Sequence, residues 1–267
     1  MLKVMPEPYK PFKNNSDFLV SKDKRGNIKQ LKNIKFGYYI LIKPSGYVPK
    51  TGVFLSKFLE KISFPKKSKV LEVGTGESAL LAIHSSFLGG NEIIAIDIDN
   101  NAIRWAKKNV KKNRLAKKIK IIKKSVFDFK TSFKPDIIIS NPPQMPVVRM
   151  KSIHDDGGRN GRRYIIQLIK LANKILKKDG KLIFTAFDFL GVNKNYNKNN
   201  SIFEILKQYS FRSKIIKSFR KEIKKTSYTF KNINQIKKVY PNYIFKKNKK
   251  GFYEHEVLIV YAKKLNL

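Results

Sequence analysis

The residues with the clearest chemical potential are Asn141, Pro142, Pro143 and Gln144, which follow the apolar run 137–139. The two prolines fix the backbone after this run and leave the carbonyl of Pro142 without a helix to satisfy it. Beside the amide side chain of Asn141, that carbonyl gives two acceptors that converge on one N–H2 donor. The pair can hold a planar, conjugated amine with its nitrogen directed at an electrophilic carbon, which is catalysis by positioning. The alternative is a turn that occurs by chance.

A glycine-containing turn forms the second chemical motif. Gly74, Thr75 and Gly76 follow the apolar run 70–73 and precede a predicted helix at 78–87. The glycines allow a sharp turn and a close approach to a ligand, and the helix N-terminus offers unpaired N–H groups. Asp97 lies 21 residues beyond Gly76, where a carboxylate can bind ribose hydroxyls. The loop alone fits a dinucleotide, S-adenosylmethionine or a turn without a ligand.

Glu72 favours S-adenosylmethionine over a dinucleotide. It is a carboxylate within an otherwise apolar strand, two positions before Gly74, and such a group is costly to bury without a partner. A dinucleotide would place a negative pyrophosphate here, whereas S-adenosylmethionine brings a cationic amino group and a sulfonium. The alternative is a strand-end carboxylate that reaches solvent.

These motifs need strands and helices that bring them to one edge of a sheet. Strands are predicted at 70–73, 92–98, 119–122, 136–140 and 181–187, and helices at 51–59, 78–87, 100–113 and 161–176. The continuously apolar runs 93–96 and 137–139 are typical of parallel strands that helices cover on both faces. We therefore expect an α/β, Rossmann-like, doubly wound and mostly parallel sheet, with ligands at the carboxyl ends of its strands.

The flanking segments complete the predicted organisation. Residues 1–50 are predicted as an N-terminal extension with a small β-hairpin within 28–43, and residues 51–267 as one catalytic domain. A helix at 202–209 and strands at 214–219 and 256–262 are expected near the end of the chain. Before the last strand, a basic insertion at 224–250 carries several aromatic residues, in a pattern suited to a phosphate backbone and exposed bases. The alternative is that these aromatic rings pack onto the sheet while the lysines face solvent.

The charge of the chain is unusually positive. Lys plus Arg total 58 against 19 Asp plus Glu, which gives a formal net charge of +39. AT-rich coding would raise the lysine content but would favour glutamate equally, so it does not explain the scarcity of acids. A field of this sign attracts polyanions and indicates a nucleic-acid-bearing partner, either as the acceptor itself or in a ribosomal or tRNA-bound complex.

Other features limit the classes of protein to consider. No apolar run approaches the roughly 18 to 20 residues that a bilayer span requires, and residues 1–10 do not read as a secretory signal, so we expect a cytoplasmic protein that does not enter membranes. The absence of cysteine excludes disulfides and a zinc-thiolate site. His154 with Asp155 and Asp156 gathers no further ligands at suitable spacing, so we expect no metal.

Taken together, these segments resemble the class I methyltransferases that modify exocyclic or amide nitrogens. The similarity is strongest to the release-factor glutamine methyltransferases and their small-methyltransferase relatives, and it rests on residues 70–76, 95–98 and 138–143. It is supported by residues 49–52, 126–128, 156–161 and 178–182 and extends over about 47–187. The resemblance implies the class I methyltransferase fold with a seven-stranded sheet, and S-adenosylmethionine as the cofactor.

The resemblance also implies roles for individual residues. The cofactor-binding residues would be Glu72, Gly74 and Gly76 at the methionine part, Asp97 at the ribose, Ser125, Val126 and Phe127 around the adenine, and also Thr75, Ile98 and Asn141. Asn141, Pro142, Pro143 and Gln144 would hold the acceptor. Two positions depart from the family pattern: Ser125 stands where relatives often carry Asp, and Gln144 where they usually place an aromatic ring against the acceptor plane.

Three functions remain open at this point. The first is methylation of a protein glutamine side chain, in a translation factor or ribosomal protein. The second is N-methylation of adenine in RNA or DNA, which the positive charge and the insertion favour. The third is a non-catalytic RNA-binding module with a methyltransferase fold, against which the intact Asn-Pro-Pro sequence argues.

Overall fold

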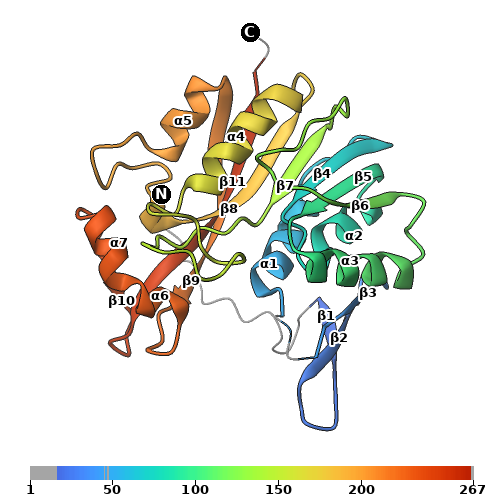
Figure 1. Cartoon of the computed structure of the whole chain (residues 1–267), viewed down its shortest axis with the longest axis horizontal. Helices are drawn as coiled ribbons and strands as arrows, with labels where there is room; N and C mark the ends of the chain where they lie inside the picture. Colours follow the sequence, from blue (N-terminus) through green and yellow to red (C-terminus); the bar gives the residue numbers. More distant parts are fainter. Residues whose placement is uncertain (1–16, 45, 47, 266–267) are drawn as a thin grey trace. The chain divides into compact units, whose positions relative to one another are not determined.

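The computed structural model describes residues 17–44, 46 and 48–265, which divide into two compact units (Figure 1). The N-terminal unit contains the described residues of 10–141 together with 175–180. The C-terminal unit contains residues 142–174 and the described residues of 181–267. Among the described residues, no helix is long and apolar enough to cross a membrane.

The N-terminal unit is built on a parallel sheet. Its strands are β4 (Ser68–Val73), β5 (Gly90–Asp97), β6 (Ile119–Lys123) and β7 (Ile137–Ser140), in the order β7-β4-β5-β6. The strands β4 and β7, which precede the two chemical motifs, are buried over almost their whole length, as expected for a sheet with both faces covered. The covering helices are α1 (Lys50–Leu59), α2 (Leu80–Phe87) and α3 (Asn100–Lys112).

A small antiparallel sheet joins this core. Its strands are β1 (Phe18–Lys22), β2 (Ile28–Asn33) and β3 (Tyr39–Leu41), so the segment predicted as a hairpin is extended by β1 into three strands. Asn109 of α3 attaches the sheet because its carboxamide accepts from Leu41 N at 2.6 Å and donates to Leu41 O at 3.2 Å. Asn113 makes the same pair of bonds with Tyr39. Two helix amides thus bind β3 as a neighbouring strand would.

The C-terminal unit is built on antiparallel strands around β11 (Tyr253–Lys264). This strand pairs with β8 (Lys181–Phe187), β9 (Phe211–Glu222) and β10 (Lys246–Lys247). The strand expected at 214–219 is twice as long because β9 follows β11 over nearly its full length. The unit also contains α4 (Arg163–Ile175), the 3-10 helix η1 (Asp188–Leu190) and α5 (Ile202–Gln208).

The basic insertion has secondary structure of its own. It forms the short helices α6 (Tyr228–Lys231) and α7 (Ile233–Val239) before β10. The side chains of Tyr240, Tyr243 and Phe245 are buried, so these rings are not available to stack on bases. Phe230 remains 37% exposed. The interpretation of the aromatic residues as a base-stacking surface is therefore wrong for the three buried rings.

Candidate functional site

The carboxyl ends of three parallel strands meet at one edge of the N-terminal sheet. Val73 of β4 is paired with Ile96 of β5 and with Ser140 of β7. The next residues along these strands are Gly74, Asp97 and Asn141. Residues that are far apart in the sequence are therefore brought together at this edge, as the motif analysis predicted.

The glycine-containing turn needs its glycines for their backbone conformation. Gly74 has φ of +74° and Gly76 has φ of +60°, in the left-handed region that glycine adopts without a steric penalty. A Cβ added at either position would meet no atom within 4 Å. The two glycines are thus not required for internal packing, and the space beside them is open to a ligand.

Asp97 links this turn to the end of β5. Its Oδ2 accepts from Gly76 N at 2.8 Å, and its Oδ1 accepts from Asp99 N at 3.0 Å. A carboxylate has about four lone-pair positions, so hydroxyl donors can still bind the same group. Asp97 therefore orients the turn and keeps the capacity to accept further hydrogen bonds.

Glu72 is buried in β4 with 2% of its surface exposed, so it does not reach solvent. Its Oε2 accepts from Thr75 Oγ1 at 2.6 Å and from Ala82 N at 2.9 Å. Burial raises the pKa of Glu72 to about 8, while the bonds from Thr75 and Ala82 oppose this change. A ligand that brings a cationic amino group would favour the ionised form, which fits the methionine part of S-adenosylmethionine.

Apolar side chains follow the two neighbouring strands β5 and β6. Asp97 is paired with Lys123, so the residues after each strand leave the sheet at adjacent positions. Ile98 is 43% exposed and Phe127 is 39% exposed, although both are large and apolar. Phe127 N donates to Ser125 Oγ at 3.1 Å, which shapes the turn that carries the ring, and Val126 is buried. Exposed apolar surfaces at this edge suit the faces of an adenine ring.

Gln144 is buried in the C-terminal unit, where its side chain joins two pieces of backbone. Its Nε2 donates to Pro142 O at 3.3 Å and to Thr185 O at 3.5 Å. Its Oε1 accepts from Phe187 N at 2.6 Å. The residue that stands where relatives carry an aromatic ring therefore fastens the turn to the end of β8.

The segment 155–161, here called the support loop, packs against the turn that contains Gln144. Gly157 N donates to Met145 O at 2.8 Å, and Met145 N donates to Asp155 O at 2.7 Å. A Cβ at Gly157 would lie 2.6 Å from the Cα of Gln144, and a Cβ at Gly161 would lie 2.5 Å from its carbonyl oxygen. Both glycines are thus required for the close approach of the two backbones.

Asp156 organises the same loop. Its buried carboxylate accepts from the backbone N–H groups of Lys151 and Ser152 and from the hydroxyl of Tyr228 in α6. Tyr240 Oη donates to Asn160 O at 2.6 Å, so the insertion holds this loop at a second place. From the sequence, Asp156 was considered as a metal ligand and as part of the family-like segment 156–161. The contacts of both tyrosines with this loop were missed, because nothing local marks a contact across some 70 to 80 residues.

A further carboxylate at the end of β8 was also missed. Asp188 Oδ2 accepts from Tyr243 Oη at 2.8 Å, and burial raises the pKa of Asp188 to about 7. The available signal was a carboxylate directly after an apolar strand.

Arg162 is another residue that the sequence did not indicate. It is buried, its guanidinium donates to Leu190 O and to Asn200 O at 2.6 Å each, and it lies 5.3 Å from the ring centre of Tyr240. Arg162 thereby ties the support loop to η1 and to the segment before α5.

Sequence comparisons agree with this arrangement. The family described as ribosomal protein L11 methyltransferase (PrmA) matches residues 46–154. A candidate protein N5-glutamine methyltransferase of Methanocaldococcus jannaschii is 29% identical over 168 residues, which are 61% of this chain and 82% of the relative. A release factor glutamine methyltransferase of Flavobacterium psychrophilum is 27% identical over 172 residues. That match covers 59% of this chain, which spans only 56% of the length of this relative.

Solved structures show the same fold. The YcgJ protein of Bacillus subtilis matches with a TM-score of 0.55 and 12% identity, over 79% of this chain and 98% of its own. The M. jannaschii tRNA m1G37 methyltransferase matches with a TM-score of 0.54 and 16% identity, over 95% of this chain and 59% of its own. The predicted class I methyltransferase fold is confirmed. The chain is an S-adenosylmethionine-dependent methyltransferase that resembles the release-factor glutamine methyltransferases.

Proposed function

We propose that the enzyme methylates the side-chain amide nitrogen of a protein glutamine in a translation factor or ribosomal protein. The observation that carries this proposal is the hydrogen bond from the carboxamide of Gln144 to the carbonyl of Pro142. A primary amide of the same type as a glutamine substrate thus already binds this carbonyl. A carbonyl oxygen has two lone pairs, so it can accept from a second amide. The names of the relatives point to the same class of acceptor.

The proposed cofactor residues divide by the part of S-adenosylmethionine that each would bind. Glu72 would face the amino group, Gly74, Thr75 and Gly76 would follow the methionine chain, and Asp97 would bind the ribose. Ile98, Ser125, Val126 and Phe127 would hold the adenine. When bound, S-adenosylmethionine supplies an electrophilic methyl group, and it leaves as S-adenosylhomocysteine.

The proposed chemistry of the acceptor residues is positioning. Asn141 Oδ1 and Pro142 O would each accept one N–H of the acceptor amide, which fixes its plane and raises the electron density on its nitrogen. The nitrogen forms the new C–N bond in an in-line displacement, and the proton then leaves to solvent. Pro143 would hold the turn rigid, and Gln144 would hold the carbonyl of Pro142 in place.

Adenine N-methylation in RNA is a second candidate, because an exocyclic amine offers the same two N–H donors to Asn141 and Pro142. The observation that favours it is the net charge of +39. For the domain organisation we propose residues 51–267 as the methyltransferase domain and 1–50 as its extension. Residues 1–16, 45, 47, 266 and 267 lie outside the described part.

One experiment separates the two acceptors. The purified protein is incubated with methyl-labelled S-adenosylmethionine and either ribosomes or a ribosome-free extract, and the products are divided between nuclease and protease digestion. Label in peptides that release methylamine on acid hydrolysis supports the glutamine acceptor. Label in a methylated adenosine overturns it in favour of the RNA acceptor, and no incorporation into either fraction excludes both.

A further inference from the structure

We propose that the outer face of α6 and α7 binds the phosphate backbone of RNA and so presents an RNA-bearing acceptor to the enzyme. This proposal rests on the proposed function in one respect: it takes residues 141–144, here called the acceptor turn, as the place where the acceptor binds. The lysine surface is defined by exposed side chains in the first part of the insertion. It consists of Lys224, Lys225, Lys231, Lys237 and Lys238.

The charge of this surface is not compensated within the insertion. Residues 224–250 contain nine lysines and no aspartate or glutamate. Among the described residues, no ion pair involves any lysine of the lysine surface. Like charges that are held together in this way repel one another. A polyanion relieves the repulsion and also releases its own counterions on binding.

The lysine surface is anchored to the loop that supports the acceptor turn. Tyr228 of α6 donates to Asp156, and Gln235 Nε2 of α7 donates to Arg159 O at 3.1 Å. The same loop packs against Gln144 through Gly157. The lysines are therefore held at a fixed place near the turn.

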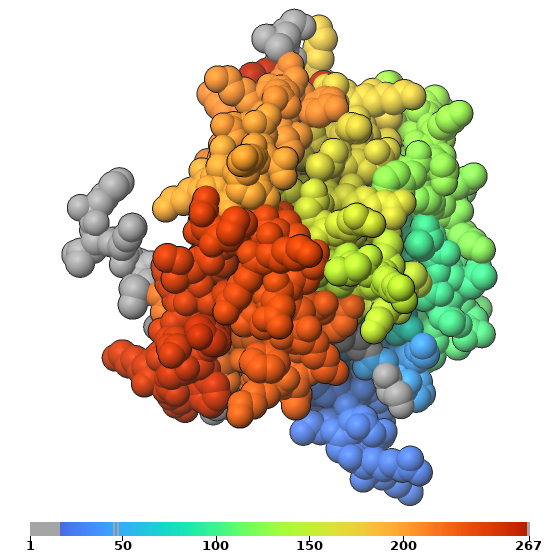
Figure 2. All heavy atoms as spheres, turned by 60° about the vertical axis from the view of Figure 1, so that its left-hand side comes forward, coloured from blue at the N-terminus to red at the C-terminus, as the bar shows by residue number. Residues whose placement is uncertain are grey.

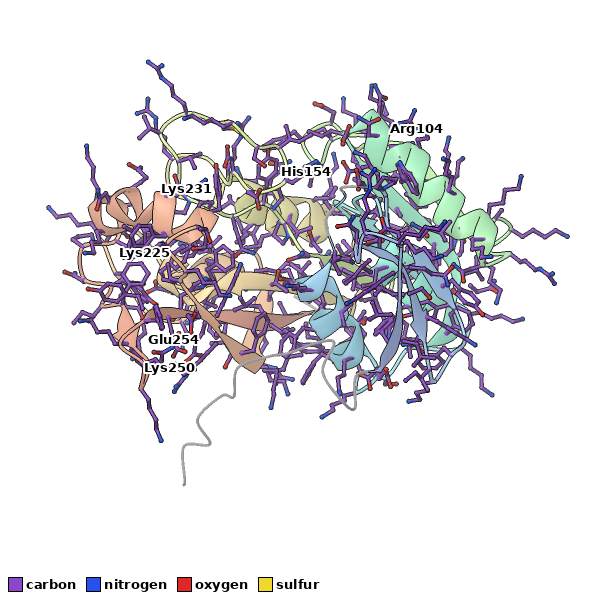
Figure 3. All side chains as sticks on the ribbon, turned by 90° about the horizontal axis from the view of Figure 1, so that it is seen from below. Arg104, His154, Lys225, Lys231, Lys250 and Glu254 are labelled. Atoms are coloured by element: carbon purple, nitrogen blue, oxygen red, sulfur yellow. The ribbon has the colours of Figure 1, made fainter. Side chains whose placement is uncertain are left out.

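The views of the C-terminal unit agree with these contacts. In Figure 2 the orange-red insertion lies beside the yellow-green segment that contains the turn and its support loop. Figure 3 shows Lys231 on the same side of this unit as the loop of His154, whereas Lys250 of the β10 hairpin points elsewhere. Lys231 thus lies apart from Lys250, at the other basic end of the insertion.

The phosphate backbone of RNA is the anion that we propose for this surface. Lysine binds phosphate as a compact point charge, and each contact with the backbone releases a counterion. Phe230 is exposed between Lys225 and Lys231 in the sequence, where its ring can stack on a base. An acidic protein could use the same charges, so competition with polyglutamate has to separate the two partners.

The test compares two triple variants with the same change of charge. The first is Lys231→Glu, Lys237→Glu and Lys238→Glu. The control is Lys107→Glu, Lys111→Glu and Lys118→Glu, which reverses exposed lysines of the N-terminal unit. Binding of a fluorescent poly(U) RNA is measured by anisotropy over a series of KCl concentrations, and S-adenosylhomocysteine binding verifies that each variant is folded.

If the lysine surface binds RNA, the first variant loses affinity by at least about tenfold. The slope of the logarithm of the binding constant against the logarithm of the KCl concentration should also become shallower by about 2, because each of the three lost phosphate contacts on a single strand contributes about 0.7. The control should change several-fold less. Equal losses in the two variants overturn the proposal, because the overall positive charge of the chain would then account for RNA binding without a specific surface. Polyglutamate that competes as well as RNA of equal charge also overturns it, in favour of an acidic protein partner.

Methyl transfer distinguishes this proposal from the proposed function. The first variant should retain transfer to an RNA-free protein acceptor and lose it on the corresponding ribonucleoprotein. If the wild-type enzyme modifies no glutamine while the difference in RNA binding persists, only the proposed acceptor is wrong. If the difference in RNA binding is absent while glutamine is methylated, only the RNA surface is wrong.

Discussion

The side-chain amide of Gln144 donates to the carbonyl oxygen of Pro142, and the same side chain accepts the backbone N–H of Phe187. One buried residue therefore holds the turn in register with the end of β8. The donor half of this amide fixes the carbonyl that the proposed mechanism needs, whereas the acceptor half only anchors Gln144 itself. The two halves can be separated by substitution.

The Gln144→Glu variant should have a kcat that rises as the pH falls. An ionised carboxylate still accepts from Phe187 but cannot donate to the Pro142 carbonyl, so kcat should fall by about tenfold at pH 8. Protonation at lower pH restores one donor, and kcat should rise toward that of the wild type. The measurement is a pH profile of kcat with saturating cofactor and acceptor.

Gln144→Met provides the control, because it fills the same volume without donor or acceptor. It should be slow at every pH. If the pH profile of Gln144→Glu parallels that of Gln144→Met, the hydrogen bond donated to the Pro142 carbonyl has no role in turnover. Gln144 would then contribute only by packing.

Asn141→Ala should lower kcat by about 10² or more while the affinity for S-adenosylhomocysteine stays within a few-fold of the wild type. The reason is that the amide of Asn141 is proposed to orient the acceptor in the transition state. Single-turnover kinetics and calorimetry measure the two quantities separately. Unchanged turnover would remove Asn141 from the mechanism.

Asp97→Ala should weaken binding of S-adenosylhomocysteine by at least about tenfold, because it removes the acceptor for ribose and the bond to Gly76. Asp97→Asn keeps an oxygen for Gly76 and should lose less. Calorimetry measures both, with NAD as the competing ligand. Binding of NAD in preference to S-adenosylhomocysteine would be incompatible with the cofactor assignment.

The sequence predicts the parts of the site whose structure follows from the local residue pattern, which are the strands and the turns that follow them. The mostly apolar segment 70–73, followed by Gly74, predicts a strand and then a turn. Parallel pairing of this strand with its two neighbours places Asp97 and Asn141 beside the turn. Helix boundaries are less certain: the helix expected from residue 78 begins at Leu80 because Ala79 has a positive φ of 47°. The sequence contains no signal for that backbone choice.

Side-chain direction and distant contacts lie beyond the sequence pattern. Gln144 was correctly placed on the turn, but only the structure shows that its amide points back at Pro142 and β8. The insertion was recognised by its composition, but the sequence left open whether its aromatic residues face a partner or pack onto the sheet. Burial of Tyr240 depends on Arg162 and Asn160, partners that no periodicity links to it.

The stability of the cofactor-free protein should depend on Glu72. Burial raises the pKa of this carboxyl from 4.5 to about 8, so between these values the folded protein holds a proton that the unfolded chain has lost. Its contribution to stability is therefore complete below about pH 4.5 and is lost as the pH rises through about 8. Glu72→Gln should flatten the fall in Tm that the wild type shows between about pH 5 and 8 in thermal scans. Parallel curves for the two proteins would refute this.

Binding of S-adenosylhomocysteine should release a proton from Glu72. The free protein at pH 7 holds this carboxyl mostly protonated, since its pKa is about 8, and the cationic amino group of the ligand favours the ionised form. Titration calorimetry in buffers of different ionisation enthalpy should therefore show the release of close to one proton per site at pH 7 and much less at pH 9. Glu72→Gln should abolish the release. Glu77→Gln is the matched control, because Glu77 follows the same turn and pairs with Lys43 at 3.0 Å, and it should leave the release unchanged. Binding without proton release in the wild type would show that Glu72 does not face the amino group.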